Sequence, residues 1–131
     1  MQTMTAPYTK YRETQIMTAS PGELIIMLYD GAIKYASQAK IYLSGRDIEK
    51  ANNSLLKAQD IIAELMGSLN LDVGKIAKDL YALYEYMLYK LTMANIKKDD
   101  KAVEEVIGLL STLRSAWEQI VRGSVTAVRE R

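Results

Sequence analysis

The side chains that most often carry chemistry in proteins are missing from this chain of 131 residues. It contains no histidine and no cysteine, which excludes the commonest general base, the commonest zinc ligand and all thiol chemistry. Most carboxylates fall between the apolar positions of the expected helices, so we expect them to face solvent: Glu23, Asp30, Glu49, Asp60, Glu64, Glu85, Glu104 and Glu105. The sequence therefore predicts no catalytic residue, no metal ligand and no cofactor.

Two kinds of helical protein could still hold a reactive site. Di-iron bundles use Glu-x-x-His motifs, which a chain without histidine cannot supply. Small helical enzymes such as chorismate mutase clamp substrate carboxylates with arginines inside the bundle. Here the arginines lie at an end, in a turn or off the apolar seams: Arg12, Arg46, Arg114 and Arg122. We expect no enzyme, and keep a helical lyase or mutase only as a third hypothesis.

The charge pattern does not favour nucleic acid or a membrane as partner. The net charge is +1, and the basic pair Lys97-Lys98 is offset at once by Asp99-Asp100. The longest apolar run, Leu24 to Tyr29, is far too short to span a bilayer. Residues 1–19 contain no apolar core of a secretory signal. We therefore expect a cytoplasmic protein.

Tyrosine and methionine are the unusual feature. The chain has nine tyrosines, seven methionines and no phenylalanine, and many of them fall on expected helices. A surplus of Tyr, Met and Ala on helix faces favours a groove that accepts another helix or an extended segment. The same surplus would also suit an interface between two copies, and the pattern alone leaves both interpretations open.

The first expected helix begins with a readable signal. Ser20 is a good N-cap, Pro21 suits the first helical position, and Glu23 can complete a capping box. The helix should run to Leu43, where Gly45 is placed to end it in a left-handed conformation.

Three more helices follow by apolar spacing. They should cover Ile48–Leu69, Lys75–Ile96 and Lys101–Arg122, with Asp47, Asp72 and either Asp99 or Asp100 as N-caps and Gly123 ending the last helix. Four long helices with short connections predict an all-α, antiparallel up-down-up-down four-helix bundle with a short N-terminal capping helix. The expected single domain comprises a disordered segment 1–7, the capping helix 8–17, the bundle 20–122 and a frayed tail 123–131.

The third of these long helices has more apolar positions than one core can absorb. Its three seams are Ile76, Leu80, Leu83 and Met87; Tyr81, Tyr84, Leu88 and Leu91; and Ala82, Tyr86, Tyr89, Met93 and Ile96. A helix needs only one apolar stripe to join a bundle, so some of these tyrosines must lie in a groove or on the surface.

Several stretches together resemble a known family. Ser20-Pro21-Gly22-Glu23-Leu24 and Met27-Leu28-Tyr29-Asp30-Gly31-Ala32 resemble the signature of the FliS family, the flagellin export chaperones of bacteria. Tyr8 and Tyr11 resemble its N-terminal motif, and similar stretches are Leu56 to Leu65, Tyr84 to Met87, Ala94 to Ile96 and Leu113 to Trp117. The resemblance covers about residues 8–121.

The resemblance implies a function. Proteins of this family bind the C-terminal segment of flagellin, which is disordered when free, prevent its premature polymerisation and deliver it to the flagellar type III export gate. The bound segment wraps the bundle and partly folds as helix, and the short N-terminal helix covers the same apolar surface in the free chaperone. Because such a cap is marginal as an isolated helix, a larger client can displace it.

Candidate site residues follow from these two lines of reasoning. The predicted client groove, with residues that contact the client or support the groove, is Leu28, Tyr29, Gln59, Ile62, Tyr84, Tyr86 and Leu88. The predicted cap is Tyr8, Tyr11 and Ile16. Gln59 either satisfies backbone groups of the client or is a plain exposed residue, and Trp117 is expected in the core rather than in contact with the client. The alternative function is a self-associating structural or adaptor bundle that forms a homodimer.

Overall fold

The computed structural model describes residues 21–130, with side chains from residue 21 to residue 123. Within this range the chain forms α2 (Pro21–Ser44), α3 (Ile48–Gly67), the short 3₁₀ helix η1 (Leu71–Val73), α4 (Lys75–Lys97) and α5 (Asp100–Glu130). The described part of the chain contains no strand, which confirms the predicted all-α class.

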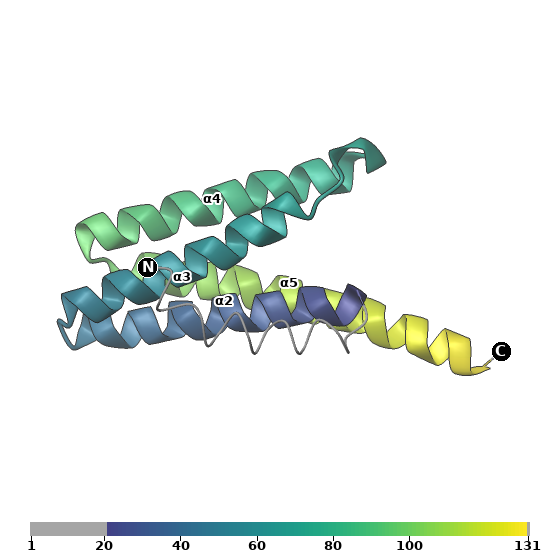
Figure 1. Cartoon of the computed structure of the whole chain (residues 1–131), viewed down its shortest axis with the longest axis horizontal. Helices are drawn as coiled ribbons and strands as arrows, with labels where there is room; N and C mark the ends of the chain where they lie inside the picture. Colours follow the sequence, from purple (N-terminus) through teal and green to yellow (C-terminus); the bar gives the residue numbers. More distant parts are fainter. Residues whose placement is uncertain (1–20, 131) are drawn as a thin grey trace.

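The four long helices form an antiparallel bundle (Figure 1). Both α2 and α4 pack against α3 and α5. Each helix therefore contacts two others, and the four helices form a closed ring. In Figure 1 α2 and α5 run side by side, whereas the end of α3 and the beginning of α4 diverge from them. The predicted up-down-up-down bundle is confirmed, while the predicted capping helix at 8–17 lies outside the described residues.

Small residues bring α2 close to its neighbours. Ala32, Ala36 and Ala39 are completely buried, and they leave room for the large core side chains of the other helices. Among those, Leu55 and Leu110 are likewise fully buried. Burial of this kind supplies most of the stability of helices that would be marginal alone.

The turn between α2 and α3 differs from the prediction at one residue. The left-handed position is Arg46, with φ of 59°, and not Gly45. The amide of Arg46 donates to the carbonyl of Leu43, and the amide of Asp47 donates to that of Tyr42. This is the Schellman pattern, which places the left-handed residue one position later than we expected. Asp47 caps α3 as predicted, because its side chain accepts from the amide of Lys50.

The connection between α3 and α4 also differs from the prediction. Helix α3 ends at Gly67, two residues before the predicted Leu69. Asp72 does not cap α4; instead its amide donates to the side chain of Asn70, which caps η1. Gly74 directly precedes α4 with φ of 129°, a conformation that a residue with a Cβ rarely adopts.

Helix α5 is longer than predicted. Its first turn is capped by Asp99, whose side chain accepts from the amide of Lys101, as expected. The predicted end at Gly123 is wrong, because the helix continues to Glu130. Glycine costs only about 1 kcal/mol within a helix, so it permits an end without enforcing one.

Candidate functional site

The predicted groove residues do not share one surface. Tyr29 and Ile62 are completely buried and Tyr84 is 1% exposed, so these three can only support a binding surface from inside. Tyr86 is exposed. The other three are half-buried at the edges of the bundle: Leu28, Gln59 and Leu88.

A hydrogen bond joins two helices through buried tyrosines. The hydroxyl of Tyr29 on α2 is hydrogen-bonded to that of Tyr84 on α4. Burial raises the pKa of both phenols, and for Tyr84 the bond to Tyr29 raises it further. For Tyr29, its interactions with Tyr84 and with Trp117 on α5 oppose the effect of burial on the pKa without cancelling it. Both tyrosines therefore stay protonated and tie α4 to α2.

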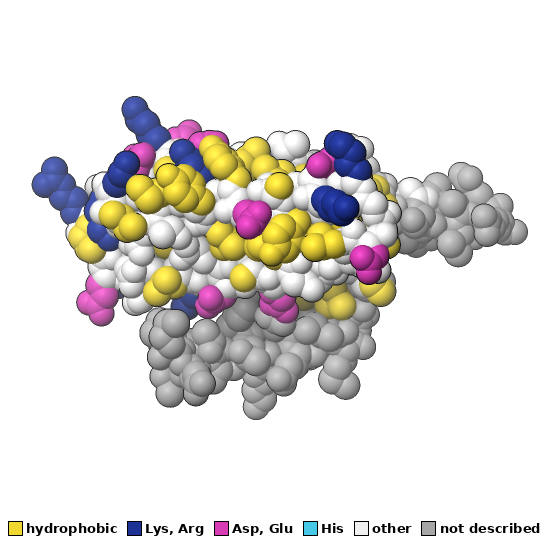
Figure 2. Space-filling view, turned by 90° about the horizontal axis from the view of Figure 1, so that it is seen from above, with side chains coloured by type: hydrophobic (Ala, Val, Ile, Leu, Met, Phe, Trp, Pro, Cys, Tyr) yellow, Lys and Arg dark blue, Asp and Glu magenta, His cyan; other side chains and the backbone are white. Residues whose placement is uncertain are grey.

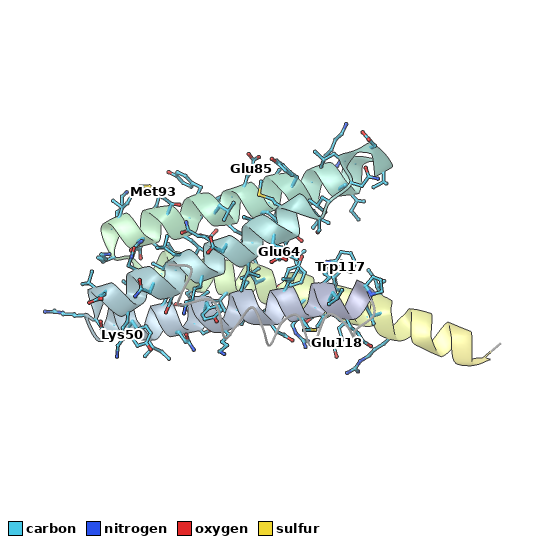
Figure 3. All side chains as sticks on the ribbon, viewed as in Figure 1. Lys50, Glu64, Glu85, Met93, Trp117 and Glu118 are labelled. Atoms are coloured by element: carbon cyan, nitrogen blue, oxygen red, sulfur yellow. The ribbon has the colours of Figure 1, made fainter. Side chains whose placement is uncertain are left out.

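Trp117 lies where the sequence placed it. It is half-buried and packs against the hydrophobic core, and Figure 3 shows it on the side of α5 that faces the bundle, with Glu118 on the opposite side. This packing agrees with the expectation that Trp117 belongs to the core.

Gln59 is a bridge between helices and not a plain exposed residue. Its Nε2 donates to Oγ1 of Thr92 at 2.7 Å and to the carbonyl of Leu88 at 3.4 Å. Thr92 in turn donates to the same Leu88 carbonyl at 2.8 Å. The amide of Gln59 thus links α3 to α4 beside Leu88, at the edge of the predicted groove.

A second amide bridge, which the sequence analysis missed, joins the same two helices. Nδ2 of Asn95 on α4 donates to Oδ1 of Asn52 on α3 at 2.6 Å, and Lys98 donates to Oδ1 of Asn95 at 2.9 Å. Asn52 and Gln59 are seven positions apart, hence two turns apart on one side of α3. That spacing was the only feature of the sequence that could have predicted the second bridge. Both bridges place polar side chains in the seam between α3 and α4.

A row of apolar side chains that face away from the core lies on α4. We call it the outer face, and it consists of Ala82, Tyr86, Tyr89, Met93 and Ile96. Tyr89 is 60% and Ile96 69% exposed. Figure 2, which looks down on α4, shows hydrophobic side chains gathered along this side, and Figure 3 shows Met93 pointing away from the other helices. Exposed apolar surface of this extent commonly marks an interaction site.

A polar cluster of Tyr86, Lys90 and Glu105 lies beside the outer face. The hydroxyl of Tyr86 donates to Glu105 on α5 at 2.5 Å, and Lys90 lies 3.2 Å from the other oxygen of that carboxylate. The hydrogen bonds from Tyr86 and from Lys90 hold the pKa of the Glu105 carboxyl below its usual range. The bond to Glu105 raises the pKa of Tyr86. The ring of Tyr86 is therefore fixed while its face remains exposed.

Ion pairs fasten α2 to α5 on another side of the bundle. Arg114 on α5 contacts Asp30 on α2 at 2.5 Å and Glu118 at 2.6 Å, and Glu118 also pairs with Arg122. The hydrogen bond to Asp30 is the main reason that the pKa of Arg114 is raised. This arginine is thus committed to neighbouring carboxylates and does not form an internal clamp for a substrate.

Comparison with known proteins identifies the family. The family model described as flagellar protein FliS matches residues 4–124. The chain belongs to the FliS family. Flagellar secretion chaperone FliS of Bacillus subtilis is 40% identical over 88% of this chain and 86% of its own length. That of Salmonella typhimurium is 42% identical over 82% of each chain.

A solved structure supports the fold. A crystal structure of a bacterial flagellar chaperone matches with a TM-score of 0.74 at 20% identity, covering 89% of this chain and 96% of the other. The resemblance to the FliS family read from the sequence is thereby confirmed, and so is the four-helix architecture. FliS proteins are chaperones, which are not a class of enzyme.

Some predicted features are not covered by the described residues. The cap residues Tyr8, Tyr11 and Ile16 lie outside them, as does the N-cap Ser20. No group of three or more acidic side chains in the described part of the chain is placed to hold a metal ion. None of the described helices combines the length and hydropathy needed to cross a membrane.

Proposed function

We propose that this FliS-family protein is a cytoplasmic export chaperone that binds the C-terminal segment of flagellin, prevents its premature polymerisation and delivers it to the flagellar type III export apparatus. The observation that carries the proposal is the outer face of α4, because apolar side chains remain exposed on a bundle whose interior is already filled. A chaperone needs such a surface to bind the apolar residues that its client would otherwise bury in a polymer.

The physical character of the surface suits a disordered client. A segment that folds on binding loses conformational entropy at that moment, so it binds with modest affinity for the area that it covers. Modest affinity allows release at the export gate without ATP hydrolysis. Tyr86 would contact the segment on the outer face, Leu88 and Gln59 would contact it at the seam between α3 and α4, and buried Tyr29, Ile62 and Tyr84 would support these surfaces from inside. Leu28 is half-buried on α2 and would contact the segment where it passes that helix.

The cap remains part of the proposal. Residues 8–17, with Tyr8, Tyr11 and Ile16, would cover apolar surface in the free protein and give way to the client. Because a helix of about ten residues is marginal in water, a client that buries more surface can displace it. Removal of residues 1–17 should then tighten the binding of client.

The direct test is a polymerisation assay. Flagellin monomers are seeded and their growth is followed by light scattering, with and without an equimolar amount of the chaperone. We expect the chaperone to suppress elongation, and flagellin without its C-terminal segment to show no binding to it. Unchanged elongation together with no complex on a sizing column would contradict the proposed function.

A second candidate is the homodimer. The outer face is a single apolar stripe on one helix, and two copies could bury it against each other. Equilibrium sedimentation of the chain alone distinguishes this candidate, since a structural dimer would persist in the presence of excess client, whereas a chaperone would form a one-to-one complex.

A further inference from the structure

Two lysines on neighbouring helices converge on one buried aromatic ring. The ammonium groups of Lys34 on α2 and Lys57 on α3 lie 5.6 Å and 5.3 Å from the centre of the Tyr35 ring. Tyr35 is only 8% exposed, whereas Lys34 is exposed and Lys57 is half-buried. The seam between α2 and α3 therefore carries two positive charges close to one point of the surface.

These two charges are not balanced by a carboxylate of the described chain. Other lysines there lie 2.9 to 3.9 Å from a carboxylate oxygen: Lys40, Lys50, Lys75 and Lys90. No described carboxylate forms such an ion pair with Lys34 or Lys57, and this includes Asp60, which is exposed three positions after Lys57 on α3. Two like charges at close range repel each other, and a carboxylate beside both would relieve that repulsion.

A carboxylate of the same chain is tethered within reach of this seam. Glu13 is the one acidic residue of segment 1–20, which joins α2 at Pro21. Lys34 lies 13 positions after Pro21, about 20 Å along the helix. A segment that is helical up to residue 17, as the sequence predicts, and extended from there to Pro21 places Glu13 about 20 Å from Pro21. The two lengths match, so Glu13 can lie beside Lys34 when the segment runs back along α2.

The side of α2 that such a segment would follow is apolar. Leu24 and Leu28 are half-buried and lie on the same side of the helix as Tyr35. The apolar residues of the predicted cap would pack on this row. A tethered segment also has an effective concentration of about millimolar, which the carboxylate of a separate molecule lacks. Charge, reach and apolar surface thus point to the same occupant.

We propose that Lys34 and Lys57 form a carboxylate-binding site that receives Glu13 and so holds segment 1–20 along the α2–α3 seam of the free protein. The role of the segment as a cap rests on the proposed function, and this inference adds the place where the cap is held and the charged contact that holds it. Because Leu28 belongs to the predicted client groove, the held segment competes with the client at α2.

Trypsin reports whether the segment is held, and it does so without any client. Cleavage after Lys10 in the folded full chain removes residues 1–10, and intact-mass spectrometry follows its rate. Lys34→Met and Lys57→Met each remove a charge and retain a flexible apolar side chain. Each should speed this cleavage about threefold, the factor expected for one exposed ion pair. Lys78→Met, at an exposed position of α4, is the matched control and should leave the rate unchanged.

Glu13→Gln separates the contact from any effect on the bundle, because it changes no residue of the described helices. It should speed cleavage after Lys10 to the same extent, and it should add nothing when Lys57→Met is already present, since both changes remove one contact. Equal cleavage rates for Lys34→Met, Lys57→Met and the unchanged chain would overturn the inference. Faster cleavage of the lysine variants without an effect of Glu13→Gln would overturn it as well.

A titration with a synthetic peptide of the flagellin C-terminal segment distinguishes this inference from the proposed function. Release of the cap should tighten peptide binding to Glu13→Gln by about the same threefold factor. If neither the unchanged chain nor any variant binds the peptide, the proposed function fails, whereas the cleavage rates still decide where the segment is held. If the lysine variants bind the peptide more weakly and are cleaved at the unchanged rate, the carboxylate belongs to the client and the inference is wrong.

Discussion

At the scale of single residues, the hydroxyl of Tyr29 connects two helices. It is hydrogen-bonded to Tyr84 on α4, it lies close to Trp117 on α5, and Tyr29 is completely buried. A buried polar group that loses its partner costs more free energy than a hydrogen bond contributes on average. The two tyrosines are therefore not equivalent, although their side chains are the same.

The asymmetry gives a prediction. Tyr84→Phe removes one hydrogen bond and leaves the Tyr29 hydroxyl beside Trp117, which also interacts with it, so it should lower the free energy of unfolding by about 1 kcal/mol. Tyr29→Phe leaves the buried Tyr84 hydroxyl without a partner, and should cost about 2–3 kcal/mol. Urea unfolding followed by Trp117 fluorescence measures both values. Equal losses for the two variants would show that the two hydroxyls are equivalent.

Glu105 gives a prediction about pH. Its pKa is lowered in the folded protein by Tyr86 and Lys90. A group whose pKa falls on folding adds stability above its unfolded pKa and loses that contribution as pH falls through its folded pKa. The melting temperature of Glu105→Gln should therefore lie below that of the unchanged chain at neutral pH, and the two should converge in acid. A gap that is the same at neutral and acid pH would contradict this role of Glu105.

At the scale of helices, the sequence predicted α3 and α4 closely, because apolar spacing and the Asp47 side chain are local signals. It assigned the left-handed residue of the α2–α3 turn to Gly45 and not to Arg46, and it ended α5 at Gly123, since glycine allows a turn without requiring one. Three apolar seams on one helix were also visible. Which seam faces inward depends on neighbours distant in sequence, and for that reason buried Tyr84 was grouped with exposed Tyr86.

Hydrogen bonds between residues far apart in the sequence could not be predicted from the sequence alone. The pairing of Tyr29 with Tyr84, 55 positions apart, and of Asn52 with Asn95, 43 apart, depends on how the helices are placed in three dimensions. Helix spacing shows only that a polar residue lies near a seam, and its partner on the next helix depends on the register between the two. The candidate surface could thus be predicted to the level of a helix, but not to that of each side chain.

The packing of α2 on α5 gives a third prediction. A Cβ on Gly22 would lie 2.6 Å from Cγ2 of Val121, whereas nothing in the described structure lies within 4 Å of a Cβ on Gly108. Gly22→Ala should therefore destabilise the protein by about 1–2 kcal/mol, a typical cost of overpacking. Gly108→Ala, at an exposed position of α5, should stabilise it by about 0.5–1 kcal/mol through helix propensity. Thermal unfolding checks both, and stabilisation by Gly22→Ala would refute a close α2–α5 contact.

At the scale of the whole molecule, the bundle combines a tightly connected pair of helices, α2 and α5, with an exposed apolar surface on α4. Ion pairs through Arg114 and the close contact at Gly22 hold α2 and α5 together. Helix α4 is attached through Tyr84, two amide bridges and Glu105, and it presents the outer face to solvent. A chaperone needs both properties, since the scaffold must stay folded while the surface accepts a segment that folds on it.

The central claim is that this surface binds and orders the C-terminal segment of flagellin. The most direct measurement is a calorimetric titration of the full chain with that segment at several temperatures, with far-UV circular dichroism recorded on the same samples. We predict one-to-one binding with a negative heat-capacity change and a gain of helicity, since apolar burial and coupled folding produce both. Absence of binding heat and of added helicity with the flagellin of the same organism would contradict the claim.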